Sequence, residues 1–353
     1  MTATAAAFDL SELSPVTHAV ACEARNGLTR NPKSLAPWLF YDETGSDLFE
    51  KITNLPEYYL TRTERTLFEA HSAEILCEMG IDSTEISAVD RPKQPIQFRD
   101  VLTIAELGAG TASKSGILLR TLASIQPQVL YHPIDVSESA LSQAKKLETE
   151  IPGVFVRTRV ANYVAEEYPI ERAARTRVLT LYIGSSIGNF APDEACSILT
   201  RLRRRLKPGD GLLLGTDLAP GPNKPLAALC GAYDDAQGIT AAFNRNILVR
   251  LNRELETNFA PESFDHLAIW NEVESRMEMH LRSLTAQIVT IPANSAGPAC
   301  TIEFKAGETI HTENSYKFTR SRIGNLLASA GFRPARTFVD RSRLFALTLA
   351  KVE

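Results

Sequence analysis

The residues best suited to bind a cofactor lie in the segment 101–116, where an apolar run leads into Glu106-Leu107-Gly108-Ala109-Gly110-Thr111. Glycines at 108 and 110 let the backbone turn tightly and approach a ligand with no Cβ atom in the way. A dinucleotide-binding loop would carry a third glycine where this chain has Ser113. The loop therefore favours a smaller adenosyl ligand without phosphates, such as S-adenosylmethionine, and a plain strand-to-helix turn is the alternative.

A second cofactor candidate follows in the segment 129–136, which is typical of a strand and has Asp135 near its end. An acidic side chain at the carboxyl end of the second strand can accept hydrogen bonds from both hydroxyls of a ribose. Ser137 is expected to cap a helix that continues to about Glu150. Asp135 could instead serve only to start that helix, but its distance along the chain from the glycine loop suits one βαβ unit.

Strand-like runs alternate with helical patterns between residues 100 and 219, which predicts an α/β fold with a parallel sheet and right-handed crossovers. The runs are rich in Val, Leu and Ile with little alternation, as in strands covered on both faces. They are 101–107, 129–136, 154–161, 177–184 and 211–218, and helical patterns follow residues 113, 137 and 192.

The C-terminal segment predicts a helix over 322–330 that ends at Gly331, followed by a hairpin of 333–340 and 344–351. Five parallel strands with a terminal antiparallel pair are expected of a class I methyltransferase (Rossmann-like) sheet. We assign 63–218 plus 318–353 to this S-adenosylmethionine-binding domain. The remaining segments, 17–62 plus 219–317, are expected to form a smaller α+β substrate-binding domain, and residues 1–16 a disordered tail.

Composition indicates a soluble globular protein that does not bind nucleic acid. The net charge is −4, and the basic cluster Arg201–Arg205 falls late in a predicted helix, where cations favour the helix dipole. Five scattered cysteines without a Cys-x-x-Cys pair argue against disulfides or a zinc site. The N-terminus lacks the cationic start of a secretory signal, and no apolar run approaches the roughly 18 residues of a membrane span. We expect a cytoplasmic monomer.

Several further peptides extend the similarity beyond a generic methyltransferase. They are the runs 40–49 (FYDETGSDLF), 55–64 (LPEYYLTRTE), 184–189 (GSSIGN), 214–218 (LGTDL), 232–235 (AYDD), 243–246 (FNRN) and 312–318 (TENSYKF). Together these runs make the chain resemble the histidine-specific Nα-methyltransferases of the ergothioneine pathway, over nearly all of the chain after residue 17.

The resemblance implies the reaction and its reactants. Three methyl groups would pass in succession from S-adenosylmethionine to the α-amino group of L-histidine. The product would be Nα,Nα,Nα-trimethylhistidine, or hercynine, and no metal would take part. The cofactor supplies the reactive methyl group, so the protein would mainly position the reactants.

The resemblance also implies which residues hold the amino-acid backbone of the substrate. Asn189 and Tyr233 would hold the α-carboxylate, since both can donate hydrogen bonds to an anion. Gly184 would leave room for the substrate amine near the methyl group. The alternatives are a turn residue for Asn189, a core aromatic for Tyr233 and a turn glycine for Gly184.

The resemblance further implies that Glu313 and Ser315 would contact the imidazole. The two residues are separated by one position, so their side chains share a face of an extended segment. A carboxylate accepts from a ring N–H, and a hydroxyl can donate or accept at the other nitrogen. Tyr41 and Tyr58 would complete this pocket, and Met279 would pack beside the ring. The alternatives are a core position for Met279 and an exposed surface carboxylate for Glu313.

On the cofactor side, Gly108 and Gly110 would contact S-adenosylmethionine and Asp135 would bind its ribose. Lys114 could meet the cofactor carboxylate, with a solvated helix surface as its alternative. Asn162 and Tyr163 occupy the place where many methyltransferases hold adenine. Family members often carry an acidic residue and Phe there, which puts the register of this pair in doubt.

Three other functions compete with histidine methylation. The first is a methyltransferase for another amino acid or an indole amine, against which Glu313 argues. An apolar ring would leave that carboxylate buried and unpaired, at a cost of roughly 1–3 kcal/mol. The second is a catalytically silent S-adenosylmethionine sensor or partner-binding module. The third, a protein or RNA methyltransferase, is disfavoured by the acidic balance of the chain.

Overall fold

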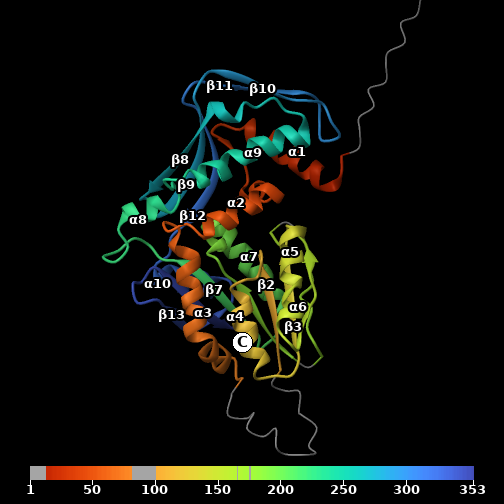
Figure 1. The fold of residues 1–353 in the computed structure, drawn as a ribbon, viewed down its shortest axis with the longest axis vertical. Coiled ribbons are helices and arrows are strands. Elements are labelled where there is room, and N and C mark those ends of the chain that lie inside the picture. The colour runs from red at the N-terminus through yellow and green to blue at the C-terminus, as the bar shows by residue number, and fades with distance from the viewer. Residues whose placement is uncertain (1–12, 82–100, 165, 175) are drawn as a thin grey trace, which may run out of the picture. The chain divides into compact units, whose positions relative to one another are not determined.

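The computed structural model describes residues 13–353, apart from 82–100, 165 and 175. The chain forms two compact units (Figure 1). Unit 1 contains the described residues up to Ile52, together with Tyr233–Ile269 and Glu278–Glu313. Unit 2 contains Thr53–Ala232, Trp270–Met277 and Asn314–Glu353.

Unit 2 is built on an eight-stranded sheet with the order β13-β14-β7-β6-β2-β3-β4, in which β5 also pairs with β3. The strands from β2 to β7 are parallel, whereas β14 runs antiparallel to β7 and to β13. This arrangement confirms the predicted α/β class and the terminal antiparallel pair. The strands are β2 (Leu102–Leu107), β3 (Val129–Asp135), β4 (Val154–Val156), β5 (Arg159–Val160), β6 (Arg177–Tyr182), β7 (Gly211–Asp217), β13 (Arg333–Val339) and β14 (Phe345–Lys351).

Helices cover both faces of this sheet. On one face, apolar residues of β2, β6 and β7 form a buried core with α7 (Pro192–Arg205) and α10 (Arg320–Ser329). On the other, α3 (Tyr59–Glu78) packs against α4 (Ser115–Ala123) and approaches β7 closely. A Cβ atom at Gly215 would lie only 2.3 Å from Oε1 of Glu64, so glycine is needed where α3 crosses the strand.

The helix after β3 begins as expected, because Oγ of Ser137 accepts a hydrogen bond from the backbone N–H of Ala140. The expected continuous helix to Glu150 is divided into α5 (Glu138–Lys145) and α6 (Leu147–Glu150). At the junction the N–H of Lys146 bonds to the carbonyl of Gln143, three residues back, which tightens the turn. The strand expected over 154–161 is likewise divided into β4 and β5.

Unit 1 combines helices with a mixed sheet whose strand order is β1-β12-β9-β8. Burial alternates along β9, as expected for a strand with one covered face. A separate antiparallel pair is formed by β10 and β11. The elements are α1 (Pro15–Leu28), β1 (Lys33–Ser34), η1 (Pro37–Phe40), α2 (Glu43–Thr53), α9 (Ile239–Leu255), η5 (Pro261–Ser263), β8 (Phe264–Asn271), β9 (Arg276–Ser283), β10 (Gln287–Ile291), β11 (Cys300–Phe304) and β12 (Thr309–Tyr316).

The predicted limits of the tail and of the two domains need correction. Helix α1 begins at Pro15, because Oγ of Ser14 caps its first turn at Thr17, so the ordered chain starts before residue 17. Residues 1–12 lie outside the described residues. Unit 2 begins at Thr53 rather than 63 because α3 packs on its sheet, and it also holds 219–232, 270–277 and 314–317. Helix α8 (Leu226–Gly231) lies in the first of these added segments.

Candidate functional site

The glycine loop and the end of β3 are joined by hydrogen bonds that shape a candidate ligand cradle in unit 2. The N–H of Gly110 donates to Oδ2 of Asp135 (2.9 Å), and the N–H of Ser137 donates to Oδ1 (2.8 Å). Gly108 and Gly110 both have positive φ, which favours glycine. The structure therefore brings the loop glycines and Asp135 together, at the carboxyl ends of neighbouring parallel strands.

Two features of this cradle suit an adenosine. The carboxylate of Asp135 accepts backbone hydrogen bonds at both oxygens, and its four lone-pair sites leave room for a ribose hydroxyl as well. A Cβ atom at Gly110 would meet no heavy atom of the described chain within 4 Å, so the backbone there is open to a ligand. Burial raises the pKa of Asp135, although the backbone donors Gly110, Ser137 and Val136 oppose that shift.

Tyr163 lies across the glycine loop, as its hydroxyl would be 3.2 Å from a Cβ atom at Gly108. Its ring meets the ring of Tyr182 edge to face, with centroids 5.7 Å apart, and burial raises its pKa. Oδ1 of the preceding Asn162 accepts from the N–H of Val164 (3.1 Å) and so shapes the local turn. The expected adenine pair thus adjoins the loop, and its contacts with adenine stay a prediction.

Lys114 forms an ion pair with Glu64, a fully buried carboxylate of α3. Both oxygens of Glu64 also accept from the N–H of Gly184 (2.9 and 3.0 Å). This places the expected cofactor lysine beside the expected substrate glycine, since a Cβ atom at Gly184 would lie 3.4 Å from Nζ of Lys114. An ammonium has three donors, so the ion pair with Glu64 leaves Lys114 able to donate to a cofactor carboxylate as well.

Glu64 was not predicted from the sequence as a site residue. The sequence indicated Glu64 only as the last residue of the run 55–64. A carboxylate in an amphipathic helix is ordinarily solvated, so nothing pointed to a buried role.

Asn189 ends the short helix η4 (Ser186–Asn189), which follows Gly184 and is half-buried at its last residue. Ser185 at its start has a left-handed backbone, and its Oγ accepts from the N–H of Asp217 (2.9 Å). A Cβ atom at Gly188 would lie 2.8 Å from the carbonyl oxygen of Tyr316, so this helix lies directly against the end of β12. Unit 2 therefore holds Asn189 near the strand segment that carries Ser315.

Ser315 and Tyr58 are also in unit 2. Ser315 is buried near the end of β12, and its Oγ accepts a hydrogen bond from Nζ of Lys317 (2.9 Å). Tyr58 is half-buried and precedes the first residue of α3, where its carbonyl accepts from Arg62 (3.2 Å). Lys317 was quoted from the sequence only as part of the run 312–318, without a role.

Unit 1 holds the other predicted substrate residues. Tyr41 packs edge to face on Phe243 of α9, with ring centroids 5.9 Å apart. Met279 is buried in β9, as its alternative core position requires, while Glu313 is half-buried in β12. Tyr233 is buried, and its carbonyl accepts from Nε2 of His266 (2.8 Å).

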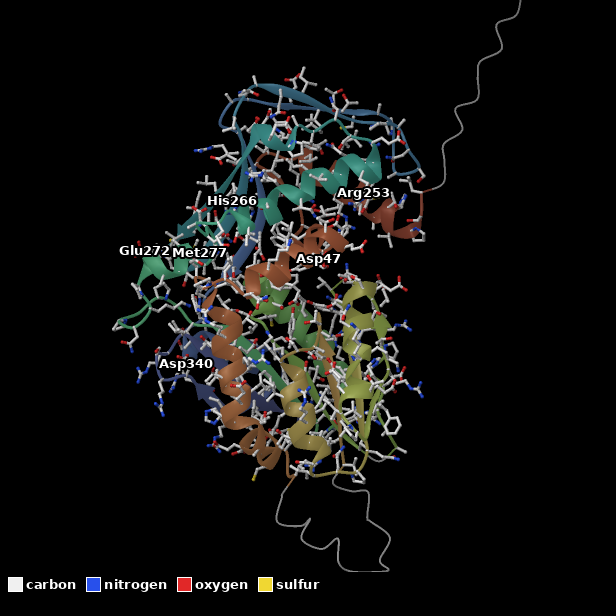
Figure 2. All side chains as sticks on the ribbon, viewed as in Figure 1. Asp47, Arg253, His266, Glu272, Met277 and Asp340 are labelled. Carbon is white, nitrogen blue, oxygen red and sulfur yellow. The ribbon has the colours of Figure 1, made fainter. Side chains whose placement is uncertain are left out.

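A buried polar chain links these residues within unit 1. Nδ2 of Asn244 donates to Nδ1 of His266 (2.8 Å), so the His266 ring is neutral and donates from Nε2 to the carbonyl of Tyr233. Oδ1 of Asn244 accepts from Thr312 (2.8 Å), whose hydroxyl also bonds the carbonyl of Met279 (3.0 Å). Burial lowers the pKa of His266, which favours the neutral ring. His266 is labelled among the side chains of the chain in Figure 2.

These hydrogen bonds connect the segments that carry Tyr233, Met279 and Glu313.

Among the residues that the structure describes, no group of three or more His, Cys, Asp or Glu side chains could hold a metal ion. Within the same part of the chain, no helix combines the length and apolarity that crossing a bilayer requires.

Comparisons with known proteins find similar sequences along almost the whole chain. A family described as histidine-specific, S-adenosylmethionine-dependent methyltransferase matches residues 20–352. A histidine N-alpha-methyltransferase of Mycolicibacterium smegmatis is 39% identical over 329 residues, covering 93% of both chains. Its namesake in Mycobacterium tuberculosis is 40% identical over 326 residues, covering 92% of both. Ergothioneine biosynthesis protein 1 of Schizosaccharomyces pombe is 27% identical over 303 residues, 84% of this chain and 36% of that protein.

Proposed function

Because the chain belongs to the histidine-specific, S-adenosylmethionine-dependent methyltransferases, we propose that it methylates the α-amino group of L-histidine. Three successive transfers would give hercynine, the first intermediate of ergothioneine biosynthesis. The observation that carries this proposal is the 40% identity to a histidine N-alpha-methyltransferase across 92% of both chains. The cradle of Gly110 and Asp135 supports the methyl donor, because it offers acceptors for a ribose beside an open backbone.

The residues of unit 2 would hold the methyl donor, which supplies an electrophilic methyl group when bound. Asp135 would accept from both ribose hydroxyls, and Gly108 and Gly110 would let the backbone approach. Lys114, held by Glu64, would face the carboxylate of the donor. Asn162 and Tyr163 would contact adenine. Tyr163 supports this role by its position across the glycine loop.

The substrate would be held at both ends while its amine stays between them. Asn189 and Tyr233 would donate to the α-carboxylate, and Glu313 and Ser315 would bind the imidazole, with Tyr41, Tyr58 and Met279 around the ring. Gly184 has no side chain and would leave space for an amine that grows with each methyl group. The amine must approach unprotonated, and after the third transfer its nitrogen has no lone pair, so the reaction stops.

The direct test is an assay of the purified protein with S-adenosylmethionine and L-histidine, read by mass spectrometry. We expect products that carry one, two and finally three methyl groups. Methylation of an indole amino acid but not of histidine would identify the rival amino-acid methyltransferase. Cofactor binding without methylation of either amino acid would indicate a silent sensor and contradict the proposal.

The imidazole contact can be tested separately with Glu313→Ala. Loss of a charged acceptor should weaken histidine affinity about tenfold to hundredfold, since a hydrogen bond to a charged group contributes about 1.5–3 kcal/mol. Cofactor affinity should stay near that of the unmodified protein. Glu303→Ala, which removes an exposed carboxylate of β11 in the same unit, is the matched control. Unchanged histidine affinity in Glu313→Ala would refute this assignment.

The cellular location and the oligomeric state are also part of the proposal. We propose that the protein works in a reducing cytoplasm, since its five cysteines are widely scattered and include no Cys-x-x-Cys pair. We further propose a monomer, which light scattering during size-exclusion chromatography would test.

A further inference from the structure

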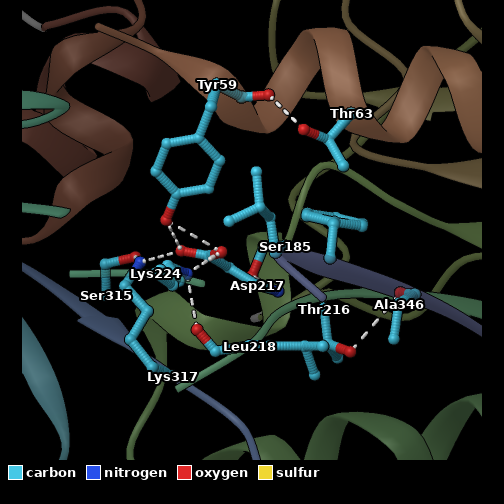
Figure 3. A network of polar contacts seen from close by, with 12 residues as sticks. Tyr59, Thr63, Ser185, Thr216, Asp217, Leu218, Lys224, Ser315, Lys317 and Ala346 are labelled. Atoms are coloured by element: carbon cyan, nitrogen blue, oxygen red, sulfur yellow. Dashed lines mark hydrogen bonds and ion pairs between the residues drawn. The ribbon is translucent and has the colours of Figure 1, made fainter. Parts of the chain in front are cut away.

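A fully buried cluster of charged groups lies beside Ser315 in unit 2 (Figure 3). At its centre is Asp217, the last residue of β7, which accepts hydrogen bonds from the Tyr59 hydroxyl at 3.0 and 2.9 Å. Lys317 pairs with one carboxylate oxygen of Asp217 (2.8 Å), and Lys224 pairs with the other. A charge removed from water in this way is stable only when it is paired and hydrogen-bonded.

The proton positions in this cluster follow from its chemistry. Burial alone would raise the pKa of Asp217, but Lys317 and Lys224 outweigh it and hold that pKa below its usual value. The carboxylate is therefore ionised and acts only as an acceptor, so both lysines and Tyr59 donate to it.

Lys317 also contacts a residue that Lys224 does not. Its Nζ donates to Oγ of Ser315 at 2.9 Å, whereas Nζ of Lys224 donates to the carbonyl of Leu218. An ammonium has no lone pair, so the serine hydroxyl must be the acceptor in this bond. The single hydrogen of that hydroxyl then points away from Lys317, toward whichever acceptor faces Ser315.

Under the proposed function, Ser315 contacts the imidazole of the substrate, so the orientation of its hydroxyl hydrogen matters. A neutral imidazole has one N–H and one nitrogen without hydrogen. A carboxylate such as Glu313 can only accept, so it suits the N–H. The complementary partner for the other nitrogen is a donor. A freely rotating hydroxyl could donate or accept, whereas one held by an ammonium is set to donate before the substrate arrives.

We propose that Lys317 is a positioning residue, whose ammonium holds the Ser315 hydroxyl as a hydrogen-bond donor to the imidazole nitrogen that carries no hydrogen. The proposal rests on the proposed function and adds a determinant of ring specificity to it. The site then favours the neutral ring and disfavours a ring that lacks the acceptor nitrogen. Asp217 contributes indirectly, because its ion pair with Lys317 fixes the position of that ammonium.

The test compares Lys317→Met with Lys224→Met. Each substitution removes one buried ammonium beside Asp217, but only Lys317 contacts Ser315. Calorimetry would measure the affinity for L-histidine and for the two pyrrolylalanine isomers, which keep a ring N–H and have no acceptor nitrogen. We expect Lys317→Met to weaken histidine about tenfold, the scale of one hydrogen bond, and to leave the pyrrolylalanines unchanged. Lys224→Met should not alter the ratio of the two affinities.

A second comparison uses Ser315→Ala as background. If Lys317 acts through Ser315, adding Lys317→Met to Ser315→Ala causes no further loss of histidine affinity. Equal weakening of histidine and the pyrrolylalanines in Lys317→Met, or an additive loss in the double variant, would overturn the proposal. Should Lys317→Met fail to fold, Ser315→Ala still tests the donor role of Ser315 on which the proposal depends, because weakening of both ligand types by the same factor would overturn the proposal. Failure of the unmodified protein to bind histidine would instead contradict the proposed function.

Discussion

Asp135 combines two tasks that a single carboxylate can perform together. Its oxygens already accept from the backbone of Gly110 and Ser137, which fixes the side chain before any ligand binds. Their remaining lone pairs are aimed by this fixed geometry rather than by the ligand. The residue therefore shapes the glycine loop and, under the proposed function, would also offer the ribose contact.

We expect Asp135→Ala to weaken S-adenosylmethionine binding about tenfold to hundredfold, because hydrogen bonds to a charged group contribute about 1.5–3 kcal/mol. Isothermal titration would measure the change, and thermal unfolding would check that the variant folds. Asp193→Ala, which removes an exposed carboxylate of α7, should bind as the unmodified protein does. Equal affinities for Asp135→Ala and this control would show that the ribose contact is elsewhere.

Glu106 is buried in β2 beside the glycine loop, where its carboxyl accepts from the hydroxyl of Tyr131. Burial raises its pKa from 4.5 to about 7. Between these values the folded chain binds more protons at this position than the unfolded chain does. The free energy of unfolding must therefore fall as the pH rises through this window, by up to about 3 kcal/mol from this group.

The variant Glu106→Gln lacks this titration and should not show that fall. Chemical unfolding between about pH 5 and pH 8 would compare the two proteins, with the difference in free energy of unfolding plotted against pH. We expect the variant to gain relative stability as the pH rises. A difference that stays constant over this range would show that Glu106 is not titrating.

At the scale of elements, the close crossing of α3 over β7 depends on Gly215. A Cβ atom there would lie 2.3 Å from Oε1 of Glu64 and 3.0 Å from Cα of Ile183. We expect Gly215→Ala to destabilise the fold by about 1–3 kcal/mol, the usual cost of overpacking a core. Because Glu64 also bonds Gly184 and Lys114, the variant should lose cofactor affinity as well.

The matched control for Gly215→Ala is Gly324→Ala in α10, where an added Cβ atom would meet no heavy atom of the described chain within 4 Å. Alanine in a helix interior should stabilise by about 0.5–1 kcal/mol relative to glycine. Denaturant unfolding would measure both variants. If Gly215→Ala were as stable as the control, α3 would have to shift freely over β7.

Most elements of unit 2 could be predicted from the sequence because each strand is a short apolar run before a turn. The limits of β2, β3 and β7 fall within one residue of the expected segments. The division of 154–161 into two strands could not be predicted, because it depends on the pairing with β3. Strand β4 pairs with the start of β3, and β5 pairs with the end of β3.

Residues of the candidate site could be predicted where their neighbours in the sequence suggest a role. They could not be predicted where the contacts come from residues far away in the sequence. Gly110 and Asp135 follow from one βαβ unit. Glu64 and Lys317, by contrast, acquire their roles from Gly184 and Asp217, which lie far away in the sequence. The neutral His266 likewise depends on Asn244 from another element. Such pairings are set by packing and leave no periodic pattern in the chain.

At the scale of the whole molecule, each unit is assembled from three separate segments of the chain. In unit 2, the last segment supplies β14, which pairs with β7 along seven residues from Phe345 to Lys351. It also supplies α10, whose Ile323 and Leu327 belong to the core on one face of the sheet. The domain limits predicted from the sequence missed several junctions because strands such as β12 pass from one unit into the other.

This interleaving predicts that the central segment cannot bind the cofactor by itself. The fragment 53–232 contains Gly108, Gly110 and Asp135, but it lacks β14, so β7 would present an unpaired edge, and its core would lose α10. We expect it to be unfolded by circular dichroism and to show no binding of S-adenosylmethionine by calorimetry. Addition of a second fragment, 314–353, supplies the missing strand pair and helix and should restore some cooperative unfolding. Binding by 53–232 alone with the affinity of the full chain would show that the parallel strands suffice.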